Sequence, residues 1–461
     1  MPQAASFPKM RSAAAWILLS AALLFLSVWK GVPHRGYGDI LQYFENTEAI
    51  WLKGELGYDA DERAPGGRLY HRYPIGLSVL SGPFLFAGLA VERISGGAVP
   101  QRAVTAFIIP LLALAACALV VDLGRQLGVA PVPTLWSALM LAAASQVLTF
   151  SRLYYTEIAI LFFVLLALAA FLRARRQDTP RTARWWFLAG TGLAGITACH
   201  YGDVALSAAL GMVFAAAVLM DNRHAWTQRL KALAALGAVP LLAGLGIMAV
   251  NRAYFGSGAS SGYHAYYQGP MFELAHLPSN LPLLGVWLIR NPWLLPALFA
   301  FPWLFRRERW LAAAVTAGLL LQMLLWVSFI DFDRFAYRYP MPLLALGVPA
   351  LLLAAKWLHE RLPRRGLAYA GLVLVGFNVL WFLRGEDIWP SFFTVPGETG
   401  VVRCHVWYMS PLPTENPAWG SPVGALQAAV LAALLAGSAL SAARAFRLAG
   451  ICAGSKEAEK D

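Results

Sequence analysis

Long apolar segments recur along this 461-residue chain, and they constrain its fold more than any other feature of the sequence. A helix that crosses a bilayer needs about 20 mostly apolar residues, with a range of roughly 17–25. The sequence therefore predicts an all-α multi-pass membrane protein, with interfacial helices in the first and in a middle external loop. The twelve predicted transmembrane helices are residues 13–29, 103–121, 134–150, 157–172, 186–200, 204–220, 232–250, 292–305, 310–330, 340–353, 367–383 and 422–440.

The composition supports this fold class and excludes several others. Hydrophobic residues make up 59% of the chain and charged residues only 13%, whereas about a quarter of an average soluble protein is charged. These fractions exclude a disordered chain and an ordinary soluble enzyme, and the presence of only four cysteines excludes a disulfide-stapled scaffold. The net charge of +12 indicates basic cytoplasmic loops facing anionic lipid in so apolar a chain, so no nucleic-acid partner is expected.

One further apolar segment, residues 74–91, is interrupted by Gly76, Gly82, Pro83 and Gly88. If it crossed the membrane, the arginine-rich loops that follow would all be external, against the positive-inside bias of short loops. We therefore predict an interfacial helix here, within a long external loop at residues 30–102. Both termini are then cytoplasmic, and the protein is expected in the plasma (inner) membrane.

The chain is predicted to form one transmembrane domain, residues 1–450, followed by a cytoplasmic tail, residues 451–461. His200 and Asp203 lie at a predicted helix junction, where a structural pair is the favoured interpretation. Cys199 and Cys404 both lie near the predicted external face, and the sequence leaves open whether they form a disulfide.

Acids, arginines and tyrosines gather at the predicted external ends of the helices. A carboxylate can act as a general base on a hydroxyl, arginines bind phosphate through paired N–H donors, and aromatic rings pack against sugars. Together they fit the transfer of a sugar from a lipid-phosphate carrier. These residues are Tyr37, Asp39, His71, Arg72, Tyr73, Arg152, Glu157, Arg252, Arg290, Arg334, Tyr337, Arg338 and Tyr339.

Four short motifs occur along the chain in a fixed order: Gly38-Asp39, His71-Arg72-Tyr73-Pro74-Ile75-Gly76-Leu77, Arg152 to Glu157, and Tyr337-Arg338-Tyr339-Pro340-Met341-Pro342-Leu343-Leu344. With the topology, they resemble the integral-membrane glycosyltransferases of the GT-C class, and most closely the aminoarabinose transferase and protein O-mannosyltransferase group. The chain departs from that group in having one acid, Asp39, where a pair is usual, and Arg72-Tyr73-Pro74 in place of a Lys-Pro-Pro core.

The resemblance implies a role for each candidate residue. Asp39 would be the catalytic base of an inverting transfer, and Glu157 a second catalytic acid on the substrate side. Alternatively, Glu157 would share a divalent cation, Mg²⁺ or Mn²⁺, with Asp39; no residue spacing predicts a metal site. Arg72 and Arg338 are the favoured contacts of the donor phosphate, with Arg252, Arg334 and Arg290 as further candidates. The expected lining residues are Tyr37, His71, Tyr73, Arg152, Tyr337 and Tyr339.

The resulting prediction is a glycosyltransferase that acts at the external face of the membrane. Its partners would be a polyprenyl-phosphate-linked sugar, a cell-envelope acceptor (lipid, glycan or protein) and membrane lipid. A transporter or flippase remains an alternative, although such proteins usually place polar groups near the bilayer midplane within repeated halves. An O-antigen ligase or polymerase, and a non-catalytic membrane scaffold, are the others.

Overall fold

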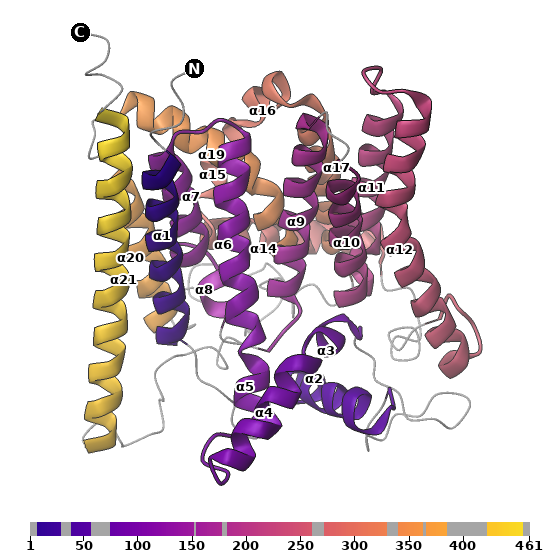
Figure 1. Cartoon of the computed structure of the whole chain (residues 1–461), viewed down its shortest axis with the longest axis horizontal. Helices are drawn as coiled ribbons and strands as arrows, with labels where there is room; N and C mark the ends of the chain where they lie inside the picture. Colours follow the sequence, from indigo (N-terminus) through magenta and orange to yellow (C-terminus); the bar gives the residue numbers. More distant parts are fainter. Residues whose placement is uncertain are drawn as a thin grey trace.

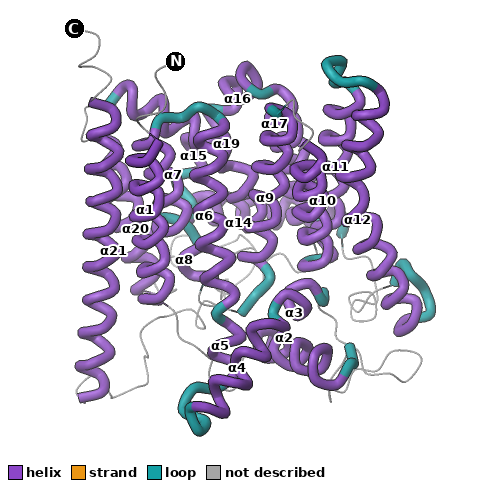
Figure 2. The backbone as a smooth tube through the Cα atoms, in the orientation of Figure 1, coloured by secondary structure: helices purple, strands orange, loops and turns teal. Residues whose placement is uncertain are grey.

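The structure is a computed structural model that describes residues 7–28, 38–56, 74–151, 154–177, 182–260, 272–329, 340–362, 366–384 and 422–454. Within these residues the regular structure is helical (Figure 2). Phe272 and Phe329 form an isolated antiparallel bridge, and the described segments contain no strand longer than this. The prediction of an all-α fold is confirmed for the described part of the chain.

Most of the longer helices run side by side as a bundle, and several short helices gather at one end of it (Figure 1). The bundle helices are α1 (Phe7–Val28), α6 (Ile108–Gln126), α7 (Pro131–Ala143), α9 (Glu157–Arg176), α10 (Thr182–Cys199), α11 (Val204–Leu219), α12 (Trp226–Phe255), α17 (Arg309–Val327), α19 (Met341–Arg361), α20 (Gly366–Arg384) and α21 (Pro422–Gly454).

Six stretches of the described chain are long and apolar enough to cross a bilayer, and each contains or overlaps one predicted span. The protein is therefore an integral membrane protein. Shorter apolar helices, Arg11–Leu26 and Pro131–Ala143, lie in two more of the predicted spans, so the full number of twelve stays a prediction. The six are Gln101–Gln126, Glu157–Arg176, Tyr201–Leu219, Trp226–Phe255, Arg309–Val327 and Met341–Arg361.

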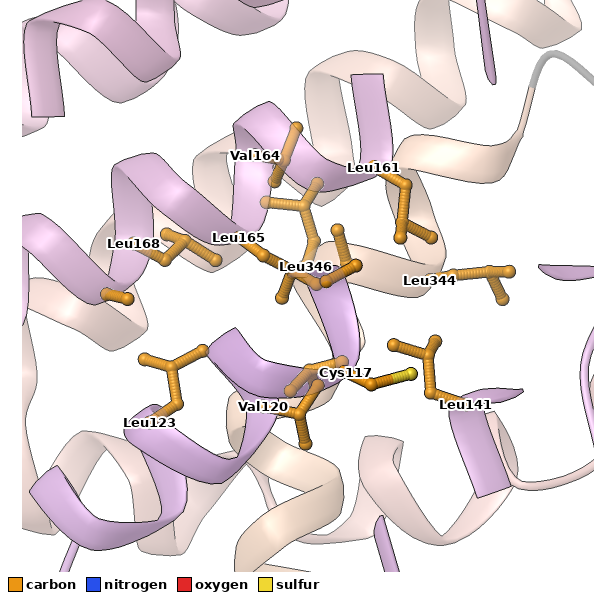
Figure 3. Close-up of a cluster of buried hydrophobic side chains, with 14 of the residues drawn as sticks. Cys117, Val120, Leu123, Leu141, Leu161, Val164, Leu165, Leu168, Leu344 and Leu346 are labelled. Carbon is orange, nitrogen blue, oxygen red and sulfur yellow. The ribbon is translucent and has the colours of Figure 1, made fainter. Parts of the chain in front are cut away.

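The core of the bundle lies where α6, α7, α9 and α19 meet (Figure 3). Apart from Cys117, the labelled side chains are aliphatic, and each of these residues is at most 1% exposed. Because lipid is as apolar as these side chains, close van der Waals packing holds such helices together better than hydrophobicity alone. The residues labelled in the figure are Cys117, Val120, Leu123, Leu141, Leu161, Val164, Leu165, Leu168, Leu344 and Leu346.

Glycines bring α10 into close contact with the helices on either side of it. A Cβ atom at Gly192 would lie 2.7 Å from the carbonyl oxygen of Phe163 on α9, and one at Gly190 would lie 2.2 Å from that of Leu236 on α12. Small residues at helix contacts are a usual feature of transmembrane packing. They fix α10 and therefore also its last residue, Cys199, next to the end of the bundle where the short helices gather.

The first and last helices of the chain lie side by side (Figure 1). The hydroxyl groups of Ser20 on α1 and Ser438 on α21 lie 3.0 Å apart, and Ser438 also donates to the Ser20 carbonyl at 2.9 Å. Arg444 stacks over the ring of Trp16, 4.4 Å from its centroid. α21 is longer than the predicted span 422–440 and continues past the predicted domain boundary at residue 450.

The basic connections that we predicted to be cytoplasmic gather at one end of the bundle. Arg173, at the end of α9, pairs with Asp122 near the end of α6. Arg176 pairs with Glu308, which precedes the first residue of α17. The shared location of these connections agrees with the argument from the positive-inside bias, whereas their side of the membrane stays a prediction.

Short helices lie at the opposite end (Figure 1). α2 (Gly38–Glu48) continues into a π-helical turn, Ala49–Lys53, and α3 (Gly76–Leu80) is followed by α4 (Gly82–Ile94) and α5 (Gln101–Ala106). α3 and α4 cover the predicted interfacial segment 74–91. They are five and 13 residues long, too short to span a bilayer, and they lie beyond the bundle helices in the figure.

The predicted span 134–150 is interrupted in the structure. α7 ends at Ala143 and α8 (Val147–Phe150) follows after three residues. Asn378 of α20 donates its amide to the carbonyls of Ala143 and Ser145, at 2.7 and 3.2 Å. Backbone carbonyls freed by a break must find donors at membrane depth, and this buried asparagine supplies one.

The predicted span 292–305 also needs correction. It consists of α15 (Leu294–Phe299) and α16 (Phe301–Arg307), and α14 (Leu277–Arg290) precedes them. α14 is the helix expected in the middle external loop, yet Trp287 on it is only 1% exposed. The second half of α14 thus packs inside the bundle, because Leu283, Leu284 and Trp287 form a buried apolar face that began before the predicted span.

Candidate active site

The short helices are attached to the bundle by a chain of buried hydroxyl groups. The phenol of Tyr154, which precedes α9, donates to Ser81 Oγ at 2.6 Å and lies 2.9 Å from Thr47 Oγ1 on α2. Its ring stacks on Phe44 with the centroids 4.1 Å apart. Tyr154 is 1% exposed, and burial raises its pKa to about 12. It therefore keeps its proton, and its hydrogen bonds, throughout the physiological pH range.

A second set of contacts holds α3 against α2. Asn46 donates its side-chain amide to Ser78 Oγ at 3.2 Å, and the indole of Trp51 donates to the Ser78 carbonyl at 3.0 Å. A Cβ atom at Gly82 would lie 2.2 Å from the Trp51 ring. Gly82, one of the glycines that interrupt the segment 74–91, thus serves close packing between the short helices.

An ion pair joins α2 to α5. Arg102 donates two parallel hydrogen bonds to Glu48, from Nε to Oε1 and from Nη2 to Oε2, both at 2.8 Å. Gln101 donates to the same carboxylate at 2.6 Å. Paired guanidinium–carboxylate bonds fix orientation as well as distance. Since α5 leads directly into α6, the pair couples α2 to the bundle.

These contacts bring α2 next to the predicted acid Glu157. Tyr43 OH lies 3.5 Å from Thr156 Oγ1, at hydrogen-bond distance, and Glu157 is the first residue of α9. The Glu157 side chain is only 5% exposed. Asp39 is the second residue of α2, four residues before Tyr43, so helical register puts positions 39 and 43 on one face of α2. The two predicted carboxylate positions therefore lie on neighbouring elements.

His200 and Asp203 form the pair that the sequence favoured. His200 Nδ1 lies 3.2 Å from Asp203 Oδ2, and Gln322 of α17 donates to the other oxygen of this carboxylate. Both members are buried, and the imidazole packs against Trp326 with the ring centroids 5.4 Å apart. A buried carboxylate with several partners is what a structural pair requires.

Arg252 lies on the part of α12 that extends beyond the predicted span 232–250. The helix has 30 residues, or about 45 Å at 1.5 Å per residue, which exceeds the hydrocarbon thickness of about 30 Å. Arg252 is exposed. Two residues later, the hydroxyl of Tyr254 accepts a hydrogen bond from the backbone N–H of Leu56 at 3.3 Å. This contact ties the end of α12 to the segment that follows α2.

The remaining predicted residues are placed in part or not at all. Arg290 is the last residue of α14, and, as for Asp39, only its backbone is described. Glu157 is placed near α2 by the contact of its neighbour Thr156 with Tyr43. Tyr37, His71, Arg72, Tyr73, Arg152, Arg334, Tyr337, Arg338 and Tyr339 lie outside the described residues.

Sequence reasoning missed Thr47, Ser81 and Tyr154, which hold the site's helices together. One signal was available: Tyr154 lies inside the motif from Arg152 to Glu157, where an aromatic residue with a polar tip is suited to an interface.

Two kinds of site that the sequence left open were also considered. Within the described residues, no group of three or more His, Cys, Asp or Glu side chains is placed to hold a metal ion. Cys199 is a buried free thiol, and Cys404, its potential disulfide partner, lies outside the described residues.

The fold and these contacts define a class: an integral-membrane bundle of helices with a set of short helices fixed over one end. A family model described as dolichyl-phosphate-mannose-protein mannosyltransferase matches residues 80–250 of the chain. No curated protein matches the sequence.

Solved structures of low sequence identity share the fold. ArnT from Cupriavidus metallidurans bound to undecaprenyl phosphate is 15% identical with a TM-score of 0.53, and the match covers 96% of this chain and 77% of that one. ArnT in the apo state has a TM-score of 0.54 at 13% identity, over 95% and 75% of the two chains. An oligosaccharyltransferase from Archaeoglobus fulgidus reaches 0.50 at 18% identity, over 90% and 57%. The resemblance to GT-C glycosyltransferases predicted from the motifs is confirmed.

Proposed function

We propose that this protein is an inverting glycosyltransferase that moves a sugar from a polyprenyl-phosphate carrier to a cell-envelope acceptor at the external face of the membrane. The similar fold of ArnT, whose structure holds undecaprenyl phosphate, supports a lipid-phosphate carrier. The family model over residues 80–250 supports sugar transfer. The whole segment 1–450 would serve as one domain, with both chain ends in the cytoplasm.

The observation that carries the proposal is the attachment of α2 to the start of α9. Contacts from Tyr43 to Thr156 and from Thr47 to Tyr154 join the helix that contains Asp39 to the residues next to Glu157. Two carboxylates on neighbouring elements at the end of a membrane bundle are suited to act on a substrate that lies at the bilayer surface.

In the proposed reaction, Asp39 accepts the proton of the acceptor hydroxyl as its oxygen attacks the anomeric carbon of the sugar. The bond between that carbon and the phosphate oxygen breaks, and the polyprenyl phosphate leaves with the electron pair. Attack opposite to the leaving group inverts the anomeric centre. Glu157 acts beside Asp39, and it either orients the acceptor or shares a divalent cation with Asp39.

The carrier phosphate would be bound by arginines. Arg72 and Arg338 are the favoured residues, and Arg252, Arg290 and Arg334 are the further candidates. Arg252 has structural support, because Tyr254 ties its helix to Leu56 near α2. The polyprenyl tail would stay in the bilayer and reach the site laterally, which explains why the enzyme is built as a membrane bundle. The remaining substrate-lining residues are those named from the sequence: Tyr37, His71, Tyr73, Arg152, Tyr337 and Tyr339.

The test is to incubate the purified protein with a panel of radiolabelled polyprenyl-phosphate sugars and envelope lipids. We expect transfer from one donor, and we expect Asp39→Asn to reduce it by about 100-fold or more, as loss of a general base does. Glu55→Gln removes an exposed carboxylate from the same external loop and should leave transfer unchanged. No transfer or donor binding across the panel, or near-normal transfer by folded Asp39→Asn, would refute the proposal.

The same assay distinguishes the two roles of Glu157. If the carboxylates share a cation, chelation abolishes transfer and Mg²⁺ or Mn²⁺ restores it. If transfer survives exhaustive chelation, the cation is excluded and Glu157 acts on the acceptor directly.

A further inference from the structure

A cleft of about 410 Å³ opens between α16 and α19. In Figure 1, α16 lies at the end of the bundle opposite to α2. The size of the cleft falls in the range of about 300–1,000 Å³ that is usual for small-ligand sites. Its lining residues are Trp303, Arg306, Arg307, Leu353, Lys356, Trp357 and Glu360. None of them belongs to the candidate active site.

The lining follows from helical register. On α16, residues 303, 306 and 307 are spaced i, i+3 and i+4, and on α19, residues 353, 356, 357 and 360 are spaced i, i+3, i+4 and i+7. Each set occupies one face of its helix, and the two helices pack against each other. The indoles of Trp303 and Trp357 meet across the contact, with their centroids 5.8 Å apart. The cleft is therefore a built feature of two facing helix stripes.

The charge of the cleft is positive and only partly neutralised. Lys356 Nζ lies 3.8 Å from Glu360 Oε1, four residues further along α19. Arg306 and Arg307 are exposed, and neither has a carboxylate partner among the described residues. Arg306 and Arg307 both line the cleft, and guanidinium groups are suited to bind a phosphate group.

The position of the cleft corresponds to the headgroup level of a bilayer. α19 is buried and apolar from Met341 to Ala355, and its first lysine, Lys356, follows directly. Exposed apolar side chains of α15 and α16, Leu298, Phe299 and Phe305, precede the two arginines. Tryptophan beside basic residues at the end of an apolar helix is typical of the membrane interface.

We propose that this cleft binds the phosphate headgroup of an anionic phospholipid. Arg306 and Arg307 contact the phosphate, while Trp303, Trp357 and Leu353 pack against the glycerol and the first carbons of the acyl chains. Basic clefts between membrane helices are known to accept such headgroups. The lipid would brace α16 against α19 at the end of the bundle away from the chemistry, and the proposal does not depend on the proposed transfer reaction.

Native mass spectrometry tests the proposal on the whole protein, purified in detergent and equilibrated with equimolar phosphatidylglycerol and phosphatidylcholine. We expect retained phosphatidylglycerol on the wild type. The double substitution Arg306→Gln/Arg307→Gln should weaken retention about 30-fold, since one basic residue near an anionic surface contributes about fivefold. The control Arg184→Gln/Arg309→Gln removes two exposed basic residues at the same end, outside the cleft, and should change retention little.

Unchanged retention by the Arg306/Arg307 variant would overturn the proposal. Equal loss of lipid by both double variants would also overturn it, because it indicates diffuse charge. So would displacement of the lipid by inorganic phosphate at an equal concentration, because it indicates a site for free anions. If Arg306→Gln/Arg307→Gln does not fold, Trp357→Leu replaces it, because this change keeps every charge and removes one wall of the cleft. Normal retention by folded Trp357→Leu would then refute the site.

Discussion

Thr47 and Tyr154 lie 2.9 Å apart at their hydroxyl oxygens, although 107 residues separate them in the sequence. Thr47 lies near the end of α2, and Tyr154 lies three residues before α9. Their contact means that α2 is positioned by the bundle itself. A candidate base on α2 can be held in place in this way.

Tyr154→Phe is expected to destabilise the protein by about 1–3 kcal/mol, because it removes the two hydrogen-bond contacts of the buried phenol, with Ser81 and with Thr47. The effect should depend on pH. The pKa of Tyr154 is raised to about 12, so above pH 10 an unfolded tyrosine loses its proton while folded Tyr154 keeps it. The stabilisation is therefore fully present below about pH 10 and declines as the pH rises towards 12.

Thermal unfolding in detergent at pH 8 and at pH 11.5 measures this change. The difference between wild type and Tyr154→Phe should be larger at pH 8. Tyr369→Phe, on a side chain that is 59% exposed, is the matched control and should change stability by less than about 0.5 kcal/mol. A constant difference at both pH values would contradict the assignment of the buried phenol.

Arg102→Lys tests the ion pair with Glu48. Lysine keeps the charge but cannot donate two parallel hydrogen bonds to one carboxylate. We expect a loss of about 1 kcal/mol or less, since both side chains are partly exposed, at 29% and 21%. A double-mutant cycle with Glu48→Gln should show coupling between the two positions. Arg93→Lys, at an exposed position of α4, is the control. Zero coupling between positions 102 and 48 would show that the pair does not hold α2.

The bundle was largely predictable from the sequence, because a run of apolar residues identifies a membrane helix without reference to its neighbours. The predicted helix boundaries were wrong where the run of apolar residues and the helix did not end at the same position. α12 continues past residue 250 through Arg252, whose charge ended the predicted span but not the helix. α14 was assigned to a loop although Trp287 is buried, since a buried face broken by polar residues resembles an interfacial helix.

The candidate site was predictable only in outline. Asp39 and Glu157 were chosen from motif order, and the structure brings their elements together. The residues that do so, Thr47 and Ser81, carried no signal, because a small hydroxyl at the contact of two helices looks the same in a sequence as one that faces solvent. Such contacts depend on segments far apart in the chain.

Asp221→Asn is expected to change the acid stability of the basic end of the bundle. A hydrogen bond from Arg223, assisted by its charge, holds the pKa of Asp221 well below its usual range. A depressed carboxyl pKa stabilises the folded state above the unfolded value of about 4, and this stabilisation is lost as the pH falls through the folded value. Unfolding measured between pH 7 and pH 3 should show a wild-type advantage that shrinks with acid. The control Glu55→Gln, at an exposed position, should show no such pH-dependent difference from the wild type. A wild-type advantage over Asp221→Asn that grows as the pH falls would contradict the prediction.

Gly76→Ala should separate α3 from α10. A Cβ atom at residue 76 would lie 2.5 Å from the carbonyl carbon and oxygen of Ala198, and backbone atoms cannot move aside as the end of a side chain can. Overpacking of this kind costs about 1–3 kcal/mol. Because Ser78 and Ser81 on the same short segment hold α2, we also expect weaker sugar transfer in the proposed assay.

The control is Gly237→Ala on α12, where a Cβ atom would meet nothing within 4 Å and helix propensity favours alanine by up to about 1 kcal/mol. Equal stability of the two variants would contradict the role of Gly76 in the close approach of α3 and α10.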